Sequence, residues 1–415
     1  MKLYDFQHTG VDFLAARARA YLADDMGLGK TAQACVATGL AGMVRRVLVV
    51  CPASAKENWR REWKTWGPLG RTFCVISWSS SQLQSEQFML GWDIMILDEA
   101  HYAKTPGAKR TRAALLAAAQ TPIVWCLSGT PNPNKHLGEL YTVFRALMPE
   151  ACAALGLRTY DEWFNHFCEW SHVGPFHARR KRVYGVKNTD DIRPYLRKFM
   201  LRRRLSDVEL QLPELRVDVH RLPRDPGFLV GADVPPELGA AYERMAAEEG
   251  SDKSTARLRR YLGEYKAPRI ARVIAEELEA QQYEKIVIMA HHRSVLKTFG
   301  ERLQKFGVIG FDGGTPSPKR QGIIDEFKSN PRKKVFVVQQ QAGGVAIDGL
   351  QVSSEIVLAE PDFTPDPIRQ QIKRIHRIGS TRPCRARVFA VADTLDEGVL
   401  GTVTMKLRHE QEIGL

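Results

Sequence analysis

The sequence predicts an α/β fold made of two lobes, each built on a parallel β-sheet flanked by helices and each carrying a helical insertion. At 415 residues the chain is longer than one hydrophobic core usually supports. Short apolar, β-branched segments alternate with helical stretches in two separate series, the pattern of parallel strands covered on both faces. We therefore predict one lobe over residues 1–205 and a second over 206–415.

The two series of expected strands lie between about residues 20 and 130 and between about residues 285 and 391. The expected strands are 21–23, 47–51, 73–77, 94–97 and 123–127 in the first series, and 286–289, 308–311, 335–339, 356–359 and 388–391 in the second. Between the series the character changes. Residues 145–195, rich in aromatics and His, and the charged residues 236–265, opened by Pro235 and Pro236, are predicted as the helical insertions of the first and second lobe.

Composition narrows the class of protein. No apolar run approaches the roughly 20 residues that cross a bilayer, and the N-terminus lacks a signal-peptide pattern. The seven cysteines are scattered and form no Cys-x-x-Cys pair, which is typical of reduced thiols in a cytosolic protein. We therefore expect no membrane partner and no disulfide framework.

The charge is basic, with a formal net charge of +13, and the excess is clustered at residues 179–182, 202–204 and 332–334. Basic surfaces attract polyanions, among which nucleic-acid phosphates are common partners inside a cell. The alternatives are ordinary solvated faces or an acidic membrane surface, and charge alone does not separate them.

A glycine-rich segment follows the first expected strand and opens a helix: Ala23-Asp24-Asp25-Met26-Gly27-Leu28-Gly29-Lys30-Thr31. In such a turn backbone N–H groups face a phosphate, Lys30 reaches the terminal phosphates, and Thr31 can ligate Mg²⁺. Asp24 stands where the strict pattern has Gly, but the two glycines supply the positive-φ freedom that the turn requires. A nucleotide site is therefore predicted, with a plain strand–helix turn as the alternative. Its residues are Met26, Gly27, Leu28, Gly29, Lys30 and Thr31.

Two carboxylates, Asp98 and Glu99, end the apolar segment 94–97 and are followed by Ala100-His101. The carboxyl ends of parallel strands form the edge where ligands bind in such sheets. Asp98 could then hold Mg²⁺, and Glu99 could orient and deprotonate the attacking water. A helix cap is the ordinary reading of such a pair, but together with the phosphate-binding loop it predicts an NTPase.

A third set of polar residues lies in the second predicted lobe. Gln370, Arg374 and Arg377 follow Asp366-Pro367, a good start for a helix, and are spaced to share one helix face. An ordinary solvated stripe is the alternative. If the lobes close on a nucleotide, the arginines become arginine fingers that stabilise charge on the γ-phosphate. We predict all three as catalytic, with Lys30, Asp98 and Glu99.

In this order the segments resemble helicase superfamily 2, and within it the Swi/Snf-type ATP-dependent DNA translocases. The resemblance rests on residues 3–11 with Gln7 as adenine reader, 49–52 with Trp59 and Trp63, 76–78, 127–131, 199–203 with 207–208 and 212–213, 291–293, 312–313 with Arg320, 342–345 and 374–379. It implies two tandem RecA-like lobes and DNA-dependent ATP hydrolysis with ATP and Mg²⁺. It also implies DNA contacts through Pro52, Ser77, Trp78, His292, Arg293, Gly343 and Gly344.

Three departures from that family pattern concern the second lobe. Gln339-Gln340-Gln341 replace small or hydroxyl residues, Asp348 lies near the usual Asn, and Lys373 replaces a small or acidic residue. They affect the expected coupling between DNA contact and hydrolysis. Residues 23–26 and 358–360 favour the annealing-helicase branch.

Four residues of the first insertion could suggest zinc: His166, Cys168, His172 and His177. Their spacing matches no standard ligand pattern, so a packed insertion is favoured over a metal site.

Three functions fit the sequence. The favoured one is an ATP-driven translocase on double-stranded DNA. The alternatives are a strand-separating, annealing or branch-migrating helicase on forked DNA and an ATP-switched nucleic-acid-binding scaffold with little turnover. The small size and the missing accessory modules predict a monomer in the cytoplasm of a bacterial or virus-infected cell, associated with the nucleoid.

Overall fold

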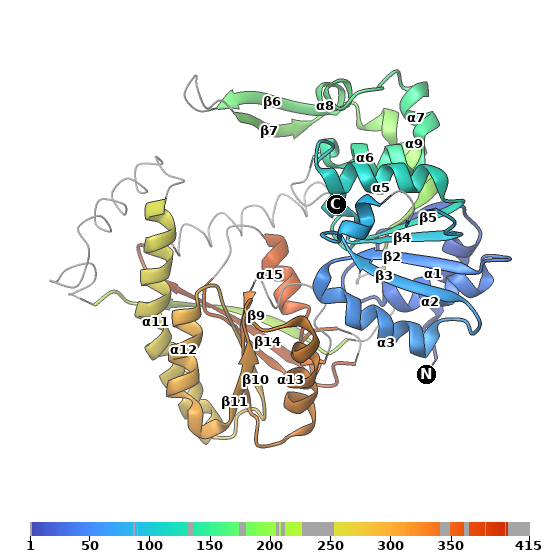
Figure 1. Cartoon of the computed structure of the whole chain (residues 1–415). Helices are drawn as coiled ribbons and strands as arrows, with labels where there is room; N and C mark the ends of the chain where they lie inside the picture. The colour runs from blue at the N-terminus through green and yellow to red at the C-terminus, as the bar shows by residue number, and fades with distance from the viewer. Residues whose placement is uncertain are drawn as a thin grey trace. The chain divides into compact units, whose positions relative to one another are not determined.

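The structure, a computed structural model, describes residues 2–85, 88, 90–131, 136–173, 180–204, 207–208, 212–225, 253–340, 349–360, 365–377, 379–394 and 396. Its contacts divide the chain into two compact units, Met1–Leu210 and Gln211–Leu415. The sequence placed the boundary between residues 205 and 206, and that finer position stays a prediction. Each unit has its own sheet, and the two-lobe α/β fold class is confirmed (Figure 1).

The first unit is built on a parallel six-stranded sheet in the order β3-β2-β4-β5-β1-β8. Its strands are β1 (Arg19–Leu22), β2 (Arg46–Cys51), β3 (Thr72–Ser77), β4 (Ile94–Asp98), β5 (Ile123–Leu127) and β8 (Met200–Leu201). All five predicted strands of the first series are present, and β8 is an additional edge strand. Because the strands are parallel, their carboxyl ends lie along one edge, which places the ends of β1 and β4 within one site.

Helices cover both faces of this sheet. Figure 1 shows α1, α2 and α3 on one face and α5 and α6 on the other. The helices of the unit are α1 (Asp5–Ala15), α2 (Lys30–Leu40), α3 (Lys56–Trp66), α5 (Lys109–Gln120), α6 (Tyr141–Leu147), α7 (Pro149–Ala154), α8 (Tyr160–Phe167) and α9 (Thr189–Phe199). Short 3₁₀ turns are η1 (Ala53–Ala55), η2 (Ser81–Gln84), η3 (Ala100–Ala103) and η4 (Leu137–Leu140). The apolar strand residues are buried between these layers, which fixes the sheet edge that carries the site.

The predicted helical insertion over 145–195 is wrong for its middle part. After α8 the chain forms an antiparallel hairpin of β6 (Cys168–Val173) and β7 (Arg180–Val186). An isolated hairpin is marginally stable in water, so it needs a packing partner. Here Lys181 Nζ lies 4.7 Å from the ring centroid of Trp170 and 5.1 Å from that of Phe164 in α8. Aromatic residues that suggested a helical core instead fasten the hairpin to α8.

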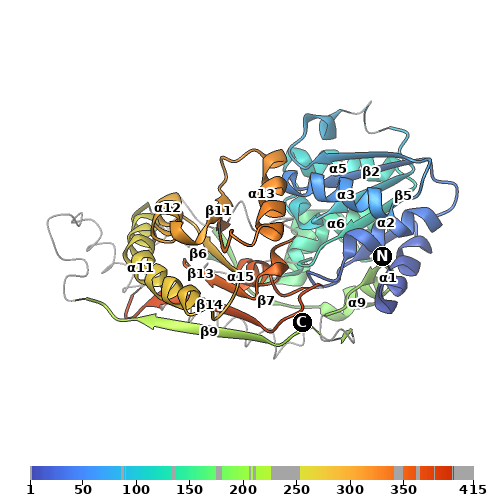
Figure 2. The same ribbon diagram turned by 90° about the horizontal axis from the view of Figure 1, so that it is seen from below.

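The second unit also has a parallel six-stranded sheet, in the order β11-β12-β10-β13-β14-β9. The strands are β9 (Leu215–Leu222), β10 (Ile286–Ala290), β11 (Val308–Phe311), β12 (Val335–Gln339), β13 (Glu355–Leu358) and β14 (Cys384–Val391). The helices are α11 (Lys253–Glu279), α12 (Arg293–Arg302), α13 (Ser317–Ser329) and α15 (Pro365–Ile372), with 3₁₀ turns η7 (Gln304–Phe306) and η8 (Leu350–Val352). Within this unit α11 and α12 pack on one face of the sheet and α13 and α15 on the other (Figures 1 and 2).

Two features of the second unit differ from the sequence-based expectation. Strand β9 was not predicted, because an edge strand with one solvated face lacks the continuous apolar run of its neighbours: Val217 and Val219 are about half exposed, at 51% and 53%. Of the helical insertion predicted over 236–265, residues 253–265 are helical, but they belong to a longer helix that packs on the sheet. They begin α11, and Leu258 and Leu262 are fully buried. Residues 236–252 lie outside the described residues.

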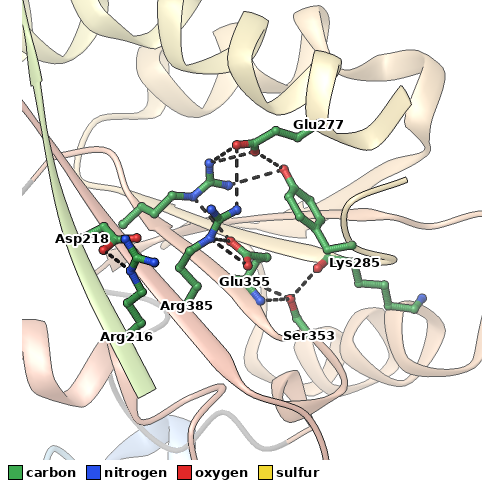
Figure 3. Close-up of polar contacts among 9 residues, drawn as sticks. Arg216, Asp218, Glu277, Lys285, Ser353, Glu355 and Arg385 are labelled. Atoms are coloured by element: carbon green, nitrogen blue, oxygen red, sulfur yellow. Dashed lines mark hydrogen bonds and ion pairs between the residues drawn. The ribbon is translucent and has the colours of Figure 1, made fainter. Parts of the chain in front are cut away.

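A buried charge network ties α11 to strands β13 and β14 (Figure 3). The Arg387 side chain is 1% exposed and its Nη1 donates to both carboxylate oxygens of Glu277, at 2.7 and 2.8 Å. On the same strand, β14, Arg385 Nε donates to both carboxylate oxygens of Glu355 on the neighbouring strand β13, at 3.1 and 3.0 Å. Tyr283 Oη also donates to Glu277, at 2.7 Å. Each buried charge thus has a partner, which buried ions require.

Candidate nucleotide-binding site

The glycine-rich segment forms the turn that the sequence predicts. It leaves β1, and α2 begins at Lys30 with Gly29 as the residue before it. Gly27 has φ 89° and Gly29 has φ 73°, a backbone conformation that side-chain-bearing residues rarely adopt. The first turn of α2 therefore presents its free N–H groups to the interior of this loop, the arrangement that binds phosphate.

Lys30 lies inside the loop. Its Nζ donates to the backbone oxygens of Asp24 and Asp25, at 2.6 and 3.0 Å. Burial lowers the pKa of Lys30, while the nearby carboxylates of Glu99, Asp24 and Asp98 act in the opposite direction. An ammonium group held by carbonyl oxygens can exchange them for the stronger charge of phosphate oxygens.

Asp98 is fixed at the end of β4 by two bonds to its carboxylate. Trp59 Nε1 donates to Oδ2 at 2.7 Å, and the N–H of Glu99 donates to Oδ1 at 3.0 Å. Burial and the adjacent Glu99 charge raise the pKa of Asp98 to about 7. The carboxylate is thus costly to ionise where it stands, and a cation beside it would remove that cost.

Glu99 occupies a strained backbone position, with φ 51° at a residue that is not Gly. Its Oε2 accepts a hydrogen bond from Ser128 Oγ at 3.1 Å and lies 3.2 Å from His101 Nδ1. Burial favours the neutral acid, but the contact with His101, the charge of Lys30 and the bond from Ser128 outweigh it and lower the pKa of Glu99. Glu99 is therefore ionised while Asp98 resists ionisation, a separation of roles that suits a base beside a metal ligand.

The segment after β5 closes against the phosphate-binding loop. A Cβ built on Gly129 would lie 2.6 Å from Met26 Cγ and 3.4 Å from Lys30 Nζ. Only Gly allows this approach. Ser128 and Gly129 therefore connect Glu99 to the loop.

Gln7 lies at the same loop. It is 5% exposed, its Oε1 accepts the N–H of Tyr4 at 3.0 Å, and its Nε2 donates to the oxygen of Leu28 at 3.1 Å. The structure thus brings Gln7, the 26–31 loop, Asp98 and Glu99 together within the first unit.

Two residues of this neighbourhood were missed as functional candidates, Arg203 and Gln33. Arg203 forms an ion pair with the fully buried carboxylate of Asp24 at 2.5 Å, and Gln33 Nε2 donates to the Leu28 oxygen at 2.9 Å. The sequence did contain one indication of such a partner: Asp24 places a carboxylate at a position where the loop pattern has Gly. A buried carboxylate requires a partner, and Arg203 of the 202–204 arginine cluster supplies it.

The predicted DNA contacts of the first unit, Pro52, Ser77 and Trp78, differ in how far their side chains are exposed. Trp78 is 3% exposed, and its Nε1 donates to the backbone oxygen of Asp98 at 2.8 Å. In this structure the ring supports the end of β4 from inside, and its assignment as a DNA contact stays a prediction. Pro52 is also buried, and Ser77 is half-buried with its hydroxyl 3.1 Å from that of Ser79.

Two predicted DNA contacts of the second unit, His292 and Arg293, lie directly after the end of β10. Glu360, 4% exposed, accepts the backbone N–H of His291 and of His292 at 2.8 and 2.9 Å, and its Oε1 lies 2.6 Å from His292 Nδ1. Arg293 pairs with Asp312 at 2.8 Å and is 62% exposed. An open hollow of about 280 Å³ is lined by Arg260, His291, His292, Arg293, Ser294 and Gln339.

The unusual glutamines have a place in this arrangement. Gln339 Nε2 donates to the oxygen of His291 at 2.9 Å, and its Oε1 accepts the N–H of Gly313 at 2.9 Å. Gln340 Nε2 donates to the oxygen of Glu360 at 2.5 Å. They connect the end of β12 to the segments that follow β10, β11 and β13. Gln341, Gly343, Gly344 and Asp348 lie outside the described residues.

The shared helix face predicted for Gln370, Arg374 and Arg377 is wrong. Helix α15 ends at Ile372, so only Gln370 belongs to it. The N–H of Arg374 bonds to the oxygen of Gln371 at 3.0 Å, three residues back, and Ser380 Oγ accepts the N–H of Arg377 at 3.0 Å. This tightening and the bond to Ser380 accompany the end of the α-helix before Arg374.

The six predicted catalytic residues are thus split between the units. Lys30, Asp98 and Glu99 form one group, while Gln370, Arg374 and Arg377 belong to the second unit. Their union into one divided site stays a prediction.

Among the described residues, no group of three or more His, Cys, Asp or Glu could hold a metal ion by itself. His166 pairs with Asp191 at 2.8 Å, Cys168 is buried, and His177 lies outside the described residues. Within the same described part of the chain, no helix is both long and apolar enough to cross a membrane.

Comparison with known proteins agrees with this geometry. A family model for the SNF2-related domain matches residues 6–89 and 71–226, which together cover more than half of the chain. The chain belongs to the SNF2-related family. A model of the helicase conserved C-terminal domain matches residues 269–379. The predicted resemblance to the Swi/Snf-type family is confirmed.

Relatives of this SNF2-related chain extend along nearly its whole length. It is 29% identical to a SWI/SNF-related matrix-associated actin-dependent regulator of chromatin subfamily A-like protein 1 homolog of Caenorhabditis elegans, over 98% of this chain and 61% of the relative. It is 26% identical to the DNA annealing helicase and endonuclease ZRANB3 of Bos taurus, over 98% of this chain and 40% of the relative. The chain therefore spans about 40–60% of the length of these relatives.

One solved structure, described as the Sulfolobus solfataricus SWI2/SNF2 ATPase core in complex with dsDNA, is 20% identical to this chain. It covers 96% of this chain and 90% of its own, with a TM-score of 0.44.

The expectation of a bacterial or viral cytoplasmic setting is wrong. The relatives above come from animals and are named for chromatin regulation or DNA annealing, and a further one is an ISWI chromatin-remodeling complex ATPase of yeast, 26% identical over 99% of this chain. Small size and missing modules were a poor guide, because a motor core of this family also occurs within much longer proteins.

Proposed function

We propose that this protein hydrolyses ATP to move along double-stranded DNA. The observation that carries the proposal is the convergence of Lys30, Asp98 and Glu99 at the carboxyl edge of one parallel sheet, in a chain of the SNF2-related family. Such an edge binds nucleotides, and a lysine with two differently ionising carboxylates suits phosphoryl transfer to water.

The residues of the loop fit a nucleotide bound with Mg²⁺. Asp98, whose pKa is raised to about 7, is a carboxylate that a divalent cation would stabilise as the anion. Thr31 lies in the first turn of α2, directly after Lys30, and its hydroxyl could ligate Mg²⁺ as well. When bound, Mg²⁺ would neutralise charge on the phosphates. Lys30 would bind the terminal phosphates, and Glu99 would accept the proton of the attacking water.

Double-stranded DNA is the partner that the charge and the relatives favour. The net charge of +13 and the basic hollow beside His292 and Arg293 suit a phosphate backbone, and relatives are named as DNA annealing helicases or chromatin-remodeling ATPases. Contacts to phosphates would make binding weakly sequence-specific and strongly salt-dependent.

The test is ATPase activity of the full chain with no nucleic acid, duplex DNA, single-stranded DNA, forked DNA and RNA. We expect the largest stimulation with duplex or forked DNA, lost progressively as salt is raised. Triplex displacement on duplex DNA would detect translocation directly. Stimulation by RNA alone would contradict the DNA assignment, and no turnover at saturating DNA would favour an ATP-switched scaffold.

A second candidate, annealing or branch migration on forked DNA, is favoured by the annealing-helicase relatives. Labelled-strand assays separate the two. Annealing of complementary strands on a fork would support this candidate, while displacement of a triplex strand without annealing would support translocation alone.

A further inference from the structure

We propose that Arg203 is a positioning residue for the nucleotide, holding the phosphate-binding loop and the segment that carries Gln7 in one fixed arrangement. The inference rests on the proposed nucleotide site. It concerns a residue outside the predicted catalytic set, in the segment 199–203 that follows α9.

The first contact is with the phosphate-binding loop. Arg203 Nε donates to Asp24 Oδ1 at 2.9 Å, and its Nη2 donates to Asp24 Oδ2 at 2.5 Å. The Asp24 side chain is 0% exposed and that of Arg203 is 12% exposed. Two parallel bonds between a guanidinium and a carboxylate fix both position and orientation. The ion pair therefore anchors the start of the loop, three residues before Gly27.

The second contact is with the first turn of α1, which contains Phe6 and Gln7. Arg203 Nη1 donates to the backbone oxygen of Phe6, and the guanidinium carbon lies 5.5 Å from the Phe6 ring centroid. Phe6 directly precedes Gln7. One guanidinium group thus touches both the phosphate-binding loop and the segment expected to read the base.

A glutamine completes the connection. Arg203 Nη2 also donates to Gln33 Oε1 at 3.0 Å, and Gln33 Nε2 donates to the oxygen of Leu28 at 2.9 Å. The same Leu28 oxygen accepts a bond from Gln7 at 3.1 Å. A Cβ on Gly10 would lie 1.8 Å from Gln33 Oε1 and 2.7 Å from Arg203 Nη2, so α1 is held close against this cluster.

The backbone supports the same arrangement. The N–H of Ala23 bonds to the oxygen of Leu201 at 2.7 Å, and the N–H of Asp25 bonds to the oxygen of Arg203 at 2.9 Å. The chain from β8 therefore runs beside the loop on both sides of Asp24. Arg203 comes from this paired segment and reaches across to α1.

These contacts favour positioning over stability alone. A buried ion pair often adds little net stability compared with apolar packing, because both ions lose their hydration. Here the partners of Arg203 lie in the phosphate-binding loop, in α2 and in the segment that carries Gln7. A bound nucleotide would contact all three, so their relative positions must be fixed. Lysine cannot reproduce these contacts, since its single ammonium lacks the planar fork.

The experiment uses the full chain with three changes. Arg203→Lys keeps the charge but removes the fork. Asp24→Asn combined with Arg203→Gln removes both charges, so that no buried charge loses its partner. Arg197→Gln, at an exposed arginine of α9, is the matched control. The readouts are melting temperature, kcat and KM for ATP at saturating DNA, and the ratio of kcat/KM between ATP and GTP.

We expect both Arg203 variants to raise KM for ATP by about tenfold or more, with kcat at saturating ATP changed by less than about threefold. The preference for ATP over GTP should fall by at least about fivefold, because Gln7 is no longer held against the loop. The control should match the wild type in every readout.

Wild-type KM and wild-type ATP preference in a folded double variant would overturn the proposal. So would failure of both Arg203 variants to fold, since that outcome makes the network a stabilising one. A wild-type chain that neither binds nor hydrolyses ATP would instead contradict the proposed function.

Discussion

At the residue scale, the site depends on two adjacent carboxylates, Asp98 and Glu99, whose surroundings shift their pKa values in opposite directions. Asp98 receives two hydrogen bonds but is crowded by the charge of Glu99, whereas Glu99 faces His101, Ser128 and Lys30. The strand ends at Asp98 and Glu99 adopts a left-handed backbone conformation, so the local pattern Asp-Glu yields two distinct chemical environments.

Replacing Glu99 by Gln should separate binding from hydrolysis. The amide keeps the size of the side chain and can still bond to Ser128, but it cannot accept a proton from water. We expect kcat to fall by at least about 10²-fold with KM for ATP changed by less than about threefold. Steady-state kinetics and ATP binding would check it, and a near-normal kcat would remove Glu99 from the role of base.

Asp98 should make the nucleotide-free protein less stable as the pH rises. Its pKa is about 7 in the folded chain, above the value near 3.9 of an unfolded Asp, so the folded state holds a proton that the unfolded state has lost. Its contribution is most favourable below about pH 4 and is lost as the pH rises to about 7. We expect the melting temperature of the wild type to decline as the pH rises from about 4 to about 7, and that of Asp98→Asn to lack this decline. The same slope of melting temperature against pH in both proteins would mean that Asp98 is not the group responsible.

At the element scale, packing around each sheet decides which strands and helices persist. The β6–β7 hairpin depends on Trp170 and Lys181 against α8, and α11 is held to β14 by the Glu277–Arg387 pair. Both elements gain their stability from contacts distant in sequence, not from local propensity.

The Glu277–Arg387 pair offers a direct test of that dependence. Glu277→Gln should destabilise the second unit by about 3 kcal/mol, because the Arg387 guanidinium, 1% exposed, loses its closer carboxylate partner at 2.7 Å and keeps the more distant carboxylate of Glu355 at 3.4 Å. Glu284→Gln is the control: Glu284 is 71% exposed and pairs with Arg382 at the surface, so we expect no measurable change. Urea unfolding followed by circular dichroism would measure both, and equal midpoints would contradict the prediction.

At the scale of the whole molecule, the divided ATPase site is the central prediction. The arginines that follow α15 are placed by tight turns in the second unit, and they would complete a site whose lysine and carboxylates belong to the first. Closure of the two units on ATP would then couple hydrolysis to movement.

Arg374→Lys in the full chain should test this division. Lysine keeps the charge but not the fork that stabilises the transferred phosphoryl group, so we expect kcat to fall by about 10²-fold or more while ATP binding to the first unit is retained. Arg382→Gln, at a 52% exposed arginine of the same unit, serves as control. Wild-type turnover by Arg374→Lys would mean that the second unit contributes no arginine finger at this position.

The sequence by itself determined the parts of this protein whose chemistry is local. The Gly27-Leu28-Gly29-Lys30 turn, the carboxylates at the end of β4 and the buried parallel strands are each specified by a few adjacent residues. The resemblance to the Swi/Snf-type family rests on the order in which these and the other segments follow one another along the chain. The hairpin and the edge strand β9 escaped prediction because exposed, alternating residues resemble loops and amphipathic helices as much as strands.

Only the tertiary structure decided the contacts between residues far apart in the chain. Asp24 meets Arg203 across 179 residues, and Glu277 meets Arg387 across 110. No periodicity encodes such pairs, since they depend on which strands become neighbours in a sheet. The sequence could indicate that a buried Asp24 needs a cation, but the choice of Arg203 follows from β8 pairing with β1.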